Sequence, residues 1–149
     1  MNTFKKARID DHITRAEFAK MISVYATTFK EKIPDTTKTA QCSTFKDLDK
    51  INEELQSYVI QSCELGLMGH YADGIVVQEM FRPHDGLVRA EVATVLSRLL
   101  RGNTYQGTEE YWYHNHLLAL RREEVIKQID IPFSQEIRGN VFLMLMRIR

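Results

Sequence analysis

The sequence predicts an all-α domain made of helix-loop-helix repeats. Three segments, residues 13–17, 87–91 and 136–140, share a short motif centred on an arginine. After each arginine, apolar residues follow at offsets of three, six, seven and ten, which is the spacing of one face of an α-helix. Unrelated amphipathic helices would not also share an arginine in register, so the three segments are predicted to be copies of one repeat.

Length and composition agree with a single domain over residues 1–149. The chain has 44% hydrophobic residues, enough to bury one core. Basic and acidic residues are equal in number, 20 each, which argues against nucleic acid as a partner. The first residues are charged rather than apolar, and no apolar run is long enough to span a bilayer. We therefore expect a soluble chain without membrane insertion, whose export signal would lie outside these residues.

Each copy is expected to begin with a short extended segment. Pro83 and Pro132 precede their motif arginines by six residues, and proline biases the residue before it toward an extended conformation. The first copy has Ile9 at that position and is the divergent one at its entrance.

Two further helices are expected between the motif helices, at about 52–67 and about 111–126. Gly66 and Gly69 lie at the end of the first of them, where a left-handed residue commonly closes a helix. Polar segments, 33–41 and 101–108, are predicted to be connecting loops. The predicted organisation is a half repeat at 1–33 and full repeats at 42–102 and 108–149, because residues 1–12 are too few for a partner helix.

The arginine of each motif lies where a helix carries the positive end of its dipole. A cation there is unfavourable by roughly 0.3–1 kcal/mol, so Arg15, Arg89 and Arg138 need a physical reason. In a structural explanation each guanidinium pairs with a carboxylate or carbonyl at a repeat junction. In a functional one it joins free helix-start N–H groups in holding an anion. The residues alone leave both open and favour the structural one, since interhelix arginine pairs are common.

The motif glutamates have different surroundings in the three copies. Glu17 with Thr14 forms a predicted capping box, in which each side chain binds a backbone N–H of the other residue. Glu91 lacks that partner because Val88 replaces the threonine, so it is more available to an arginine or a ligand. The third copy has Asn140 instead.

Other polar groups suggest no catalytic site. His114 and His116 alternate along a helix without a third ligand, so no metal site is expected. Asp47 and Asp73 are explained by turns, and Trp112 by core packing or by stacking on a sugar. The sequence shows no phosphate loop and no set of nucleophile, base and orienting group, so we expect neither an enzyme nor a cofactor. The two cysteines are too few for a disulfide scaffold and lack zinc-site spacing, which leaves one bridge or two thiols.

The aligned repeats resemble a known family. Residues 45–49, 63–69 and 81–91 together resemble the S-layer homology domain, a bacterial surface module marked by a Thr-Arg-Ala-Glu motif after a Phe-x-Pro segment. The resemblance extends from about Ile13 to Arg149 and is strongest in the second repeat. It weakens in the third, where Glu124 replaces the helix-terminal glycine and Asn140 the glutamate, so the third groove is expected to be structural only.

The resemblance implies a pseudo-threefold bundle of three prongs, with the first repeat incomplete. It also implies a module at the cell surface that anchors an exported parent protein by binding secondary cell-wall polysaccharide, often pyruvylated, in grooves between prongs. Two alternatives stay open, an assembly domain that self-associates without a glycan and an intracellular helical adaptor. The residues carried over are the anion contacts, their supports and the close-approach backbone, which are Arg15, Arg89, Arg138, Glu17, Glu91, Gly66 and Gly69.

The resemblance further implies a disulfide between Cys42 and Cys63. In the prong geometry the chain entering a helix returns close to the chain leaving it. An exported module would also meet an oxidising compartment.

Overall fold

The computed structural model describes residues 7–148, and the fold of these residues is all-α, as predicted. No helix in this range is long and apolar enough to cross a membrane. The pseudo-threefold arrangement of prongs stays a prediction. The helices and two 3₁₀ turns are α2 (Arg15–Thr28), η1 (Thr36–Lys38), α3 (Thr39–Cys42), η2 (Leu48–Lys50), α4 (Glu53–Glu64), α5 (Arg89–Arg101), α6 (His114–Arg122) and α7 (Arg138–Arg147).

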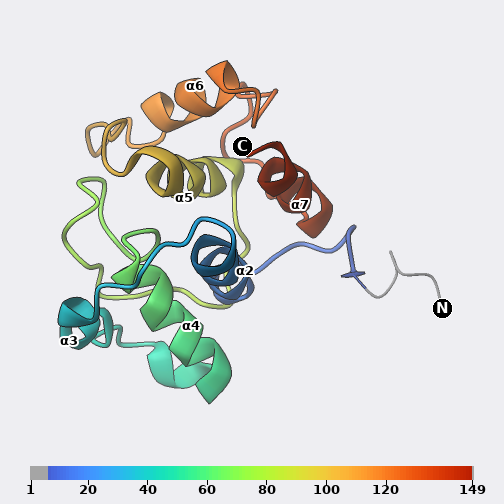
Figure 1. Ribbon diagram of the computed structural model, residues 1–149. Helices are drawn as coiled ribbons and strands as arrows, with labels where there is room; N and C mark the ends of the chain where they lie inside the picture. The colour runs from blue at the N-terminus through green and yellow to red at the C-terminus, as the bar shows by residue number, and fades with distance from the viewer. Residues whose placement is uncertain (1–6, 149) are drawn as a thin grey trace.

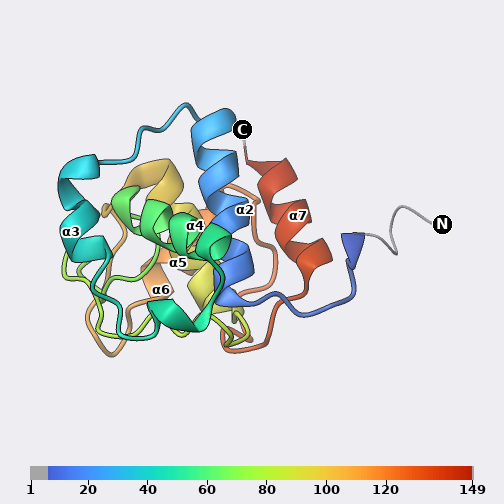
Figure 2. The same ribbon diagram turned by 90° about the horizontal axis from the view of Figure 1, so that it is seen from below.

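The three motif helices are α2, α5 and α7, and each begins at its motif arginine. Helix α4 packs along α2, and α6 packs along α5 (Figure 1). Helix α7 lies beside α2 in both views (Figures 1 and 2), and the Tyr25 hydroxyl of α2 donates to the Leu145 carbonyl of α7 at 3.3 Å. Helices α2 and α7 are therefore neighbours, while α4 packs on α2 and α6 packs on α5.

The apolar stripe of the motif helices forms the centre of the core. At the offset of three residues Phe18, Val92 and Val141 are fully buried. At the offset of seven, Ile22 and Leu96 are also fully buried. Burial is thus equal in the three helices at the offset of three, while at the offsets of six and ten the first copy is less buried, since Met21 and Tyr25 are only partly buried.

Helices α4 and α6 are shorter than the sequence predicted. Helix α4 starts after Asn52, whose side chain accepts from the Leu55 N–H at 2.9 Å, and it ends two residues before Gly66, which has a φ of +75°. Glu124 lies two residues after α6 and has a φ of +60°. A left-handed residue thus stops both helices at the same place, although the third repeat has no glycine there.

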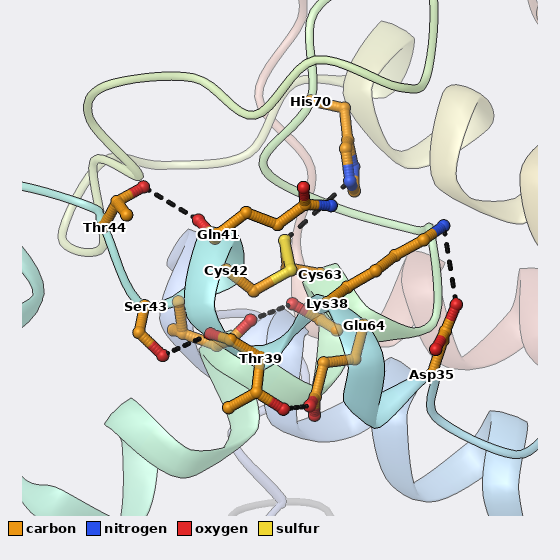
Figure 3. The surroundings of a disulfide bond; sticks show 12 residues. Asp35, Lys38, Thr39, Gln41, Cys42, Ser43, Thr44, Cys63, Glu64 and His70 are labelled. Atoms are coloured by element: carbon orange, nitrogen blue, oxygen red, sulfur yellow. Dashed lines mark hydrogen bonds and ion pairs between the residues drawn. A yellow bond between two sulfur atoms is a disulfide. The ribbon is translucent and has the colours of Figure 1, made fainter.

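The predicted loop 33–41 is partly helical, so that prediction was wrong in part. Asp35 accepts a hydrogen bond from the Thr37 N–H at 3.1 Å and thereby caps η1, which leads directly into α3. Helix α3 then lies across the end of α4, and the Thr39 hydroxyl donates to Glu64 (Figure 3). The segment is a strap over α4 rather than an irregular loop.

The Cys42–Cys63 disulfide fastens this strap to α4, as the resemblance implied (Figure 3). Both cysteines are fully buried. His70 follows the end of α4, and its Nε2 lies 3.8 Å from the Cys63 sulfur. The bridge therefore holds the strap, the last turn of α4 and the segment that follows it at one point.

Replacing both cysteines, Cys42→Ser with Cys63→Ser, should lower the free energy of unfolding by about 3 kcal/mol, because the bridge closes a segment with a sequence separation of 21. Urea unfolding followed by circular dichroism measures the change. Free thiols in the oxidised wild-type protein, detected by mass spectrometry, would contradict the assignment.

Candidate functional site

The motif arginines form a closed cycle of ion pairs between copies. Arg15 pairs with Glu91 of the second copy, and Arg89 with Glu136 of the third. Arg138 completes the cycle, since its Nη1 lies 2.8 Å from Glu17 Oε2 of the first copy. Each arginine thus meets a carboxylate of another copy, as the structural explanation requires.

Backbone hydrogen bonds follow the same cycle. The first two N–H groups of each motif helix donate to carbonyls four and six residues before the next arginine. The N–H groups of Arg15 and Ala16, for example, donate to Asp85 and Pro83, both at 3.0 Å. The other pairs are Arg89 to Ser134, Ala90 to Pro132, Arg138 to Asp11 and Gly139 to Ile9. These helix-start N–H groups are therefore already occupied by protein acceptors.

The third copy supplies its carboxylate from a different position. Asn140 stands where the other copies have glutamate, but Glu136, two residues before the motif arginine, is fully buried and accepts from Arg89. Asn140 donates to the same carboxylate at 3.1 Å. The corresponding residues are the buried Ile13 and Leu87, so a glutamate in an apolar position of the aligned motif was the signal that sequence analysis missed.

Glu136→Leu should lower the free energy of unfolding by about 3–5 kcal/mol, because it leaves the largely buried Arg89 without a counter-charge. Adding Asn140→Glu should recover most of this loss, since it restores the arrangement of the second copy. Urea titrations of both variants measure the effect, with Glu110→Leu at an exposed site as the control. Equal stability of the single and double variants would contradict the claim that Glu136 takes the place of the motif glutamate as the partner of Arg89.

A groove of about 420 Å³ lies beside Arg15 and is called groove 1. The predicted residues Glu91 and Gly69 line it with Arg15, and Trp112 borders it from the third repeat. The remaining lining residues are Leu67, Met68, His70, Tyr71, Ala72, Gln78, Arg82, Leu87, Thr94, Val95, Arg98 and Glu109. Groove 1 thus combines apolar walls with several charged groups.

Arg15 is fixed in the wall of groove 1. Its side chain is 7% exposed, its Nε donates to the Phe81 carbonyl at 2.7 Å, and its guanidinium lies 5.1 Å from the Phe81 ring centre. Asp47 in turn accepts from the N–H groups of Phe81 and Arg82 at 2.9 and 2.8 Å. Burial lowers the pKa of Arg15, and the Glu91 charge opposes that shift. Asp47 therefore positions the segment that receives the arginine.

Arg98, like Arg82 and Glu109, is a charged residue of groove 1 that the sequence did not single out. It is 8% exposed, and burial lowers its pKa. Its Nη2 donates to the Tyr71 carbonyl at 3.1 Å, while within residues 7–148 its Nε has no hydrogen-bond partner and the guanidinium forms no ion pair. Arg98 lies nine residues after Arg89, as Arg147 lies nine after Arg138, and this shared offset was the available signal.

Two buried histidines lie near Arg98 and are neutral at pH 7. Burial, with a smaller effect from Arg98, lowers the pKa of His70 to about 4, and that of His116 to about 4 for the same reasons. His116 lies in α6, where its Nδ1 is 2.7 Å from the Ser97 hydroxyl. Neither histidine compensates the charge of Arg98, whereas the nearby Asp73 carboxylate does so in part, because its charge raises the pKa of Arg98 against the effect of burial.

Acid should destabilise the protein through these histidines. Their folded pKa values of about 4 lie below the ordinary 6.5, so the unfolded chain takes up protons first and stability falls as the pH drops from about 6.5 to about 4. His116→Asn keeps a group near Ser97 and should lose less stability than wild type between about pH 7 and pH 5. The exposed His114→Asn is the matched control. If the free energy of unfolding depends on pH identically in wild type and His116→Asn, the claim that His116 is buried in its neutral form would be refuted.

A second groove, of about 350 Å³, lies beside Arg89 and is called groove 2. It occupies the corresponding junction between the second and third copies. Its lining residues are Arg89, Ile126, Lys127, Gln128, Asn140, Leu143, Met144 and Arg147.

The predicted site residues are thus divided among three places. Arg15, Glu91 and Gly69 meet at groove 1, Arg89 lies at groove 2, and Arg138 with Glu17 lines neither. Gly69 has a φ of +86°, and a Cβ there would lie 2.5 Å from the Phe45 ring, so its close approach is to a side chain. Gly66 instead closes α4, and nothing lies within 4 Å of the position of its Cβ. An anion contact by any of the three motif arginines stays a prediction.

Comparisons with known proteins give one partial similarity. The chain is 25% identical, over an alignment of 147 residues, to Cell surface glycoprotein 1 of Acetivibrio thermocellus, and the match covers 86% of this chain but 6% of that protein. No family model matches the chain, and no solved structure matches it. The chain is therefore similar to a small part of a much longer cell-surface protein.

Proposed function

We propose that this chain is a non-catalytic cell-surface module that binds an anionic cell-envelope polysaccharide in groove 1. The observation that carries the proposal is Arg98, a buried cation in the groove wall that forms no ion pair within the described residues. A buried charge is costly unless it is paired, and a ligand carboxylate supplies the pair. The similarity to a cell surface glycoprotein agrees with this location.

The charges in groove 1 suit a single negative charge. Among the lining residues the cations are Arg15, Arg82 and Arg98 and the acids are Glu91 and Glu109, a net charge of one positive unit because His70 is neutral. Two carboxylates outside the lining add negative charge nearby, Asp85 beside Arg82 and Asp73 near Arg98. Arg15 and Arg82 both contact Glu91. The unpaired charge belongs to Arg98, whose planar guanidinium matches a carboxylate such as that of a pyruvyl group.

The remaining walls suit a sugar. Trp112 offers an aromatic face, and Leu67, Met68 and Val95 provide apolar surface. The Trp112 ring packs edge-on against Tyr113, which packs against Phe133, so the aromatic wall is held in place. The volume of about 420 Å³ lies in the range of small-ligand sites. A pyruvylated sugar of a secondary cell-wall polysaccharide meets these requirements.

The second candidate is an assembly domain that makes only protein contacts. The cycle of ion pairs favours it, because Arg15, Arg89 and Arg138 are all engaged in holding the copies together. Exposed apolar side chains on α7, Leu143 at 48% and Met146 at 80%, would then contact another protein. This candidate assigns no ligand to Arg98.

Binding to purified bacterial sacculi separates the two candidates. The wild-type protein should pellet with sacculi, and it should stay in solution after chemical removal of the secondary polymer. Arg98→Gln should weaken binding about tenfold or more, because it removes a charge-assisted contact. The exposed Arg121→Gln on α6 removes the same charge and should bind like wild type.

Pelleting that is unchanged by polymer removal and by Arg98→Gln would overturn the proposal in favour of assembly. Circular dichroism of Arg98→Gln establishes that its fold is intact. A second variant, Trp112→Ala, tests the sugar-stacking wall without altering any charge.

A further inference from the structure

We propose that groove 2 is a second anion site, one that takes a doubly charged sugar phosphate. Three cations from different segments converge on it, namely Arg89 at the start of α5, Lys127 after α6 and Arg147 at the end of α7. Arg89 is held by Glu136 and by the Gln128 carbonyl, to which its Nη1 donates at 3.2 Å. Within residues 7–148, Lys127 and Arg147 form no ion pair.

Among residues 7–148, no acidic side chain lines groove 2. Asn140 occupies the position that Glu91 has in groove 1, and the compensating carboxylate of Glu136 is fully buried against Arg89. By lining residues alone, groove 2 carries three positive units and groove 1 carries one. Glu136 offsets the charge of Arg89 and leaves two positive units at groove 2. In the third copy the carboxylate is supplied by Glu136, outside the groove lining, instead of by residue 140 within it. The ion pair with Arg89 is kept, and the groove lining is more positive than it would be with a glutamate at position 140.

The chemistry of the cations favours phosphate over a single carboxylate. Lys127 is exposed and acts as a mobile point charge, while Arg147 is held by a hydrogen bond from its Nη1 to the Val125 carbonyl at 3.3 Å. A phosphate monoester carries close to two negative charges at neutral pH and three acceptor oxygens, which matches this set. Ile126, Leu143 and Met144 form the apolar wall against which the attached sugar would lie.

This inference differs from the expectation that the groove affected by Asn140 is structural only. It rests on the proposed function only in assuming that the phosphate belongs to the same envelope polymer. A polymer held at both grooves would gain avidity, because the second contact becomes intramolecular.

NMR titration of the whole chain with glucose 6-phosphate tests groove 2 directly. The sugar phosphate should shift the backbone amides of 126–128 and 140–147, glucuronate should shift them less, and glucose not at all. Lys127→Gln with Arg147→Gln should weaken the apparent affinity about tenfold or more. The control is Lys32→Gln with Arg121→Gln, which removes the same charge from exposed positions outside both grooves.

A further variant, Leu143→Glu, places a carboxylate in the half-exposed wall and should abolish the response. Absence of shifts in wild type, or equal affinity of Lys127→Gln with Arg147→Gln and wild type, would overturn the inference. Arg98-dependent pelleting without a phosphate response would refute groove 2 alone. If glucose 6-phosphate shifts the amides in a way that depends on Lys127 and Arg147, but the protein does not pellet with sacculi, the proposed function alone would be refuted.

Discussion

A buried guanidinium at the start of a helix is the constraint on which this structure depends. Arg15 has lost most of its water and lies at the positive end of α2, so both burial and the helix dipole oppose its charge. The Glu91 carboxylate that offsets this cost comes from a different copy of the motif. Because the same holds at Arg89 and Arg138, no copy satisfies its own arginine, and the three copies depend on one another.

The second arginine of a motif helix is placed under the opposite conditions. Arg98 and Arg147 lie in the last turns of α5 and α7, where the negative end of the dipole favours a cation. The dipole offsets part of the cost of their charges, and each side chain lines a groove. Position along the helix thus separates the arginines that pair with another copy from those that line a groove without an ion pair within the described residues.

Local features of the fold were predictable, whereas long-range pairings were not. The apolar offsets and Gly66 predicted the motif helices and the end of α4, because both reflect the geometry of one segment. The partner of Arg89 depends on which residue of the third copy faces α5, so Glu136 passed unnoticed in an apolar position. Arg98 was equally hidden, since its burial comes from a segment near Tyr71 that is far away in sequence.

The three junctions also differ in their residues. At the junction closed by Arg138, Val24 of α2 stands at the offset where α5 and α7 carry Arg98 and Arg147, so that junction lacks a groove cation from the helix. Its helix start has Gly139 where the others have alanine, and an added Cβ would lie 3.0 Å from the Ile9 carbonyl that accepts from the Gly139 N–H. Glycine there allows the segment before α2 to approach closely. At this third junction the charge of Arg138 is paired with Glu17, and this ion pair joins the third copy to the first.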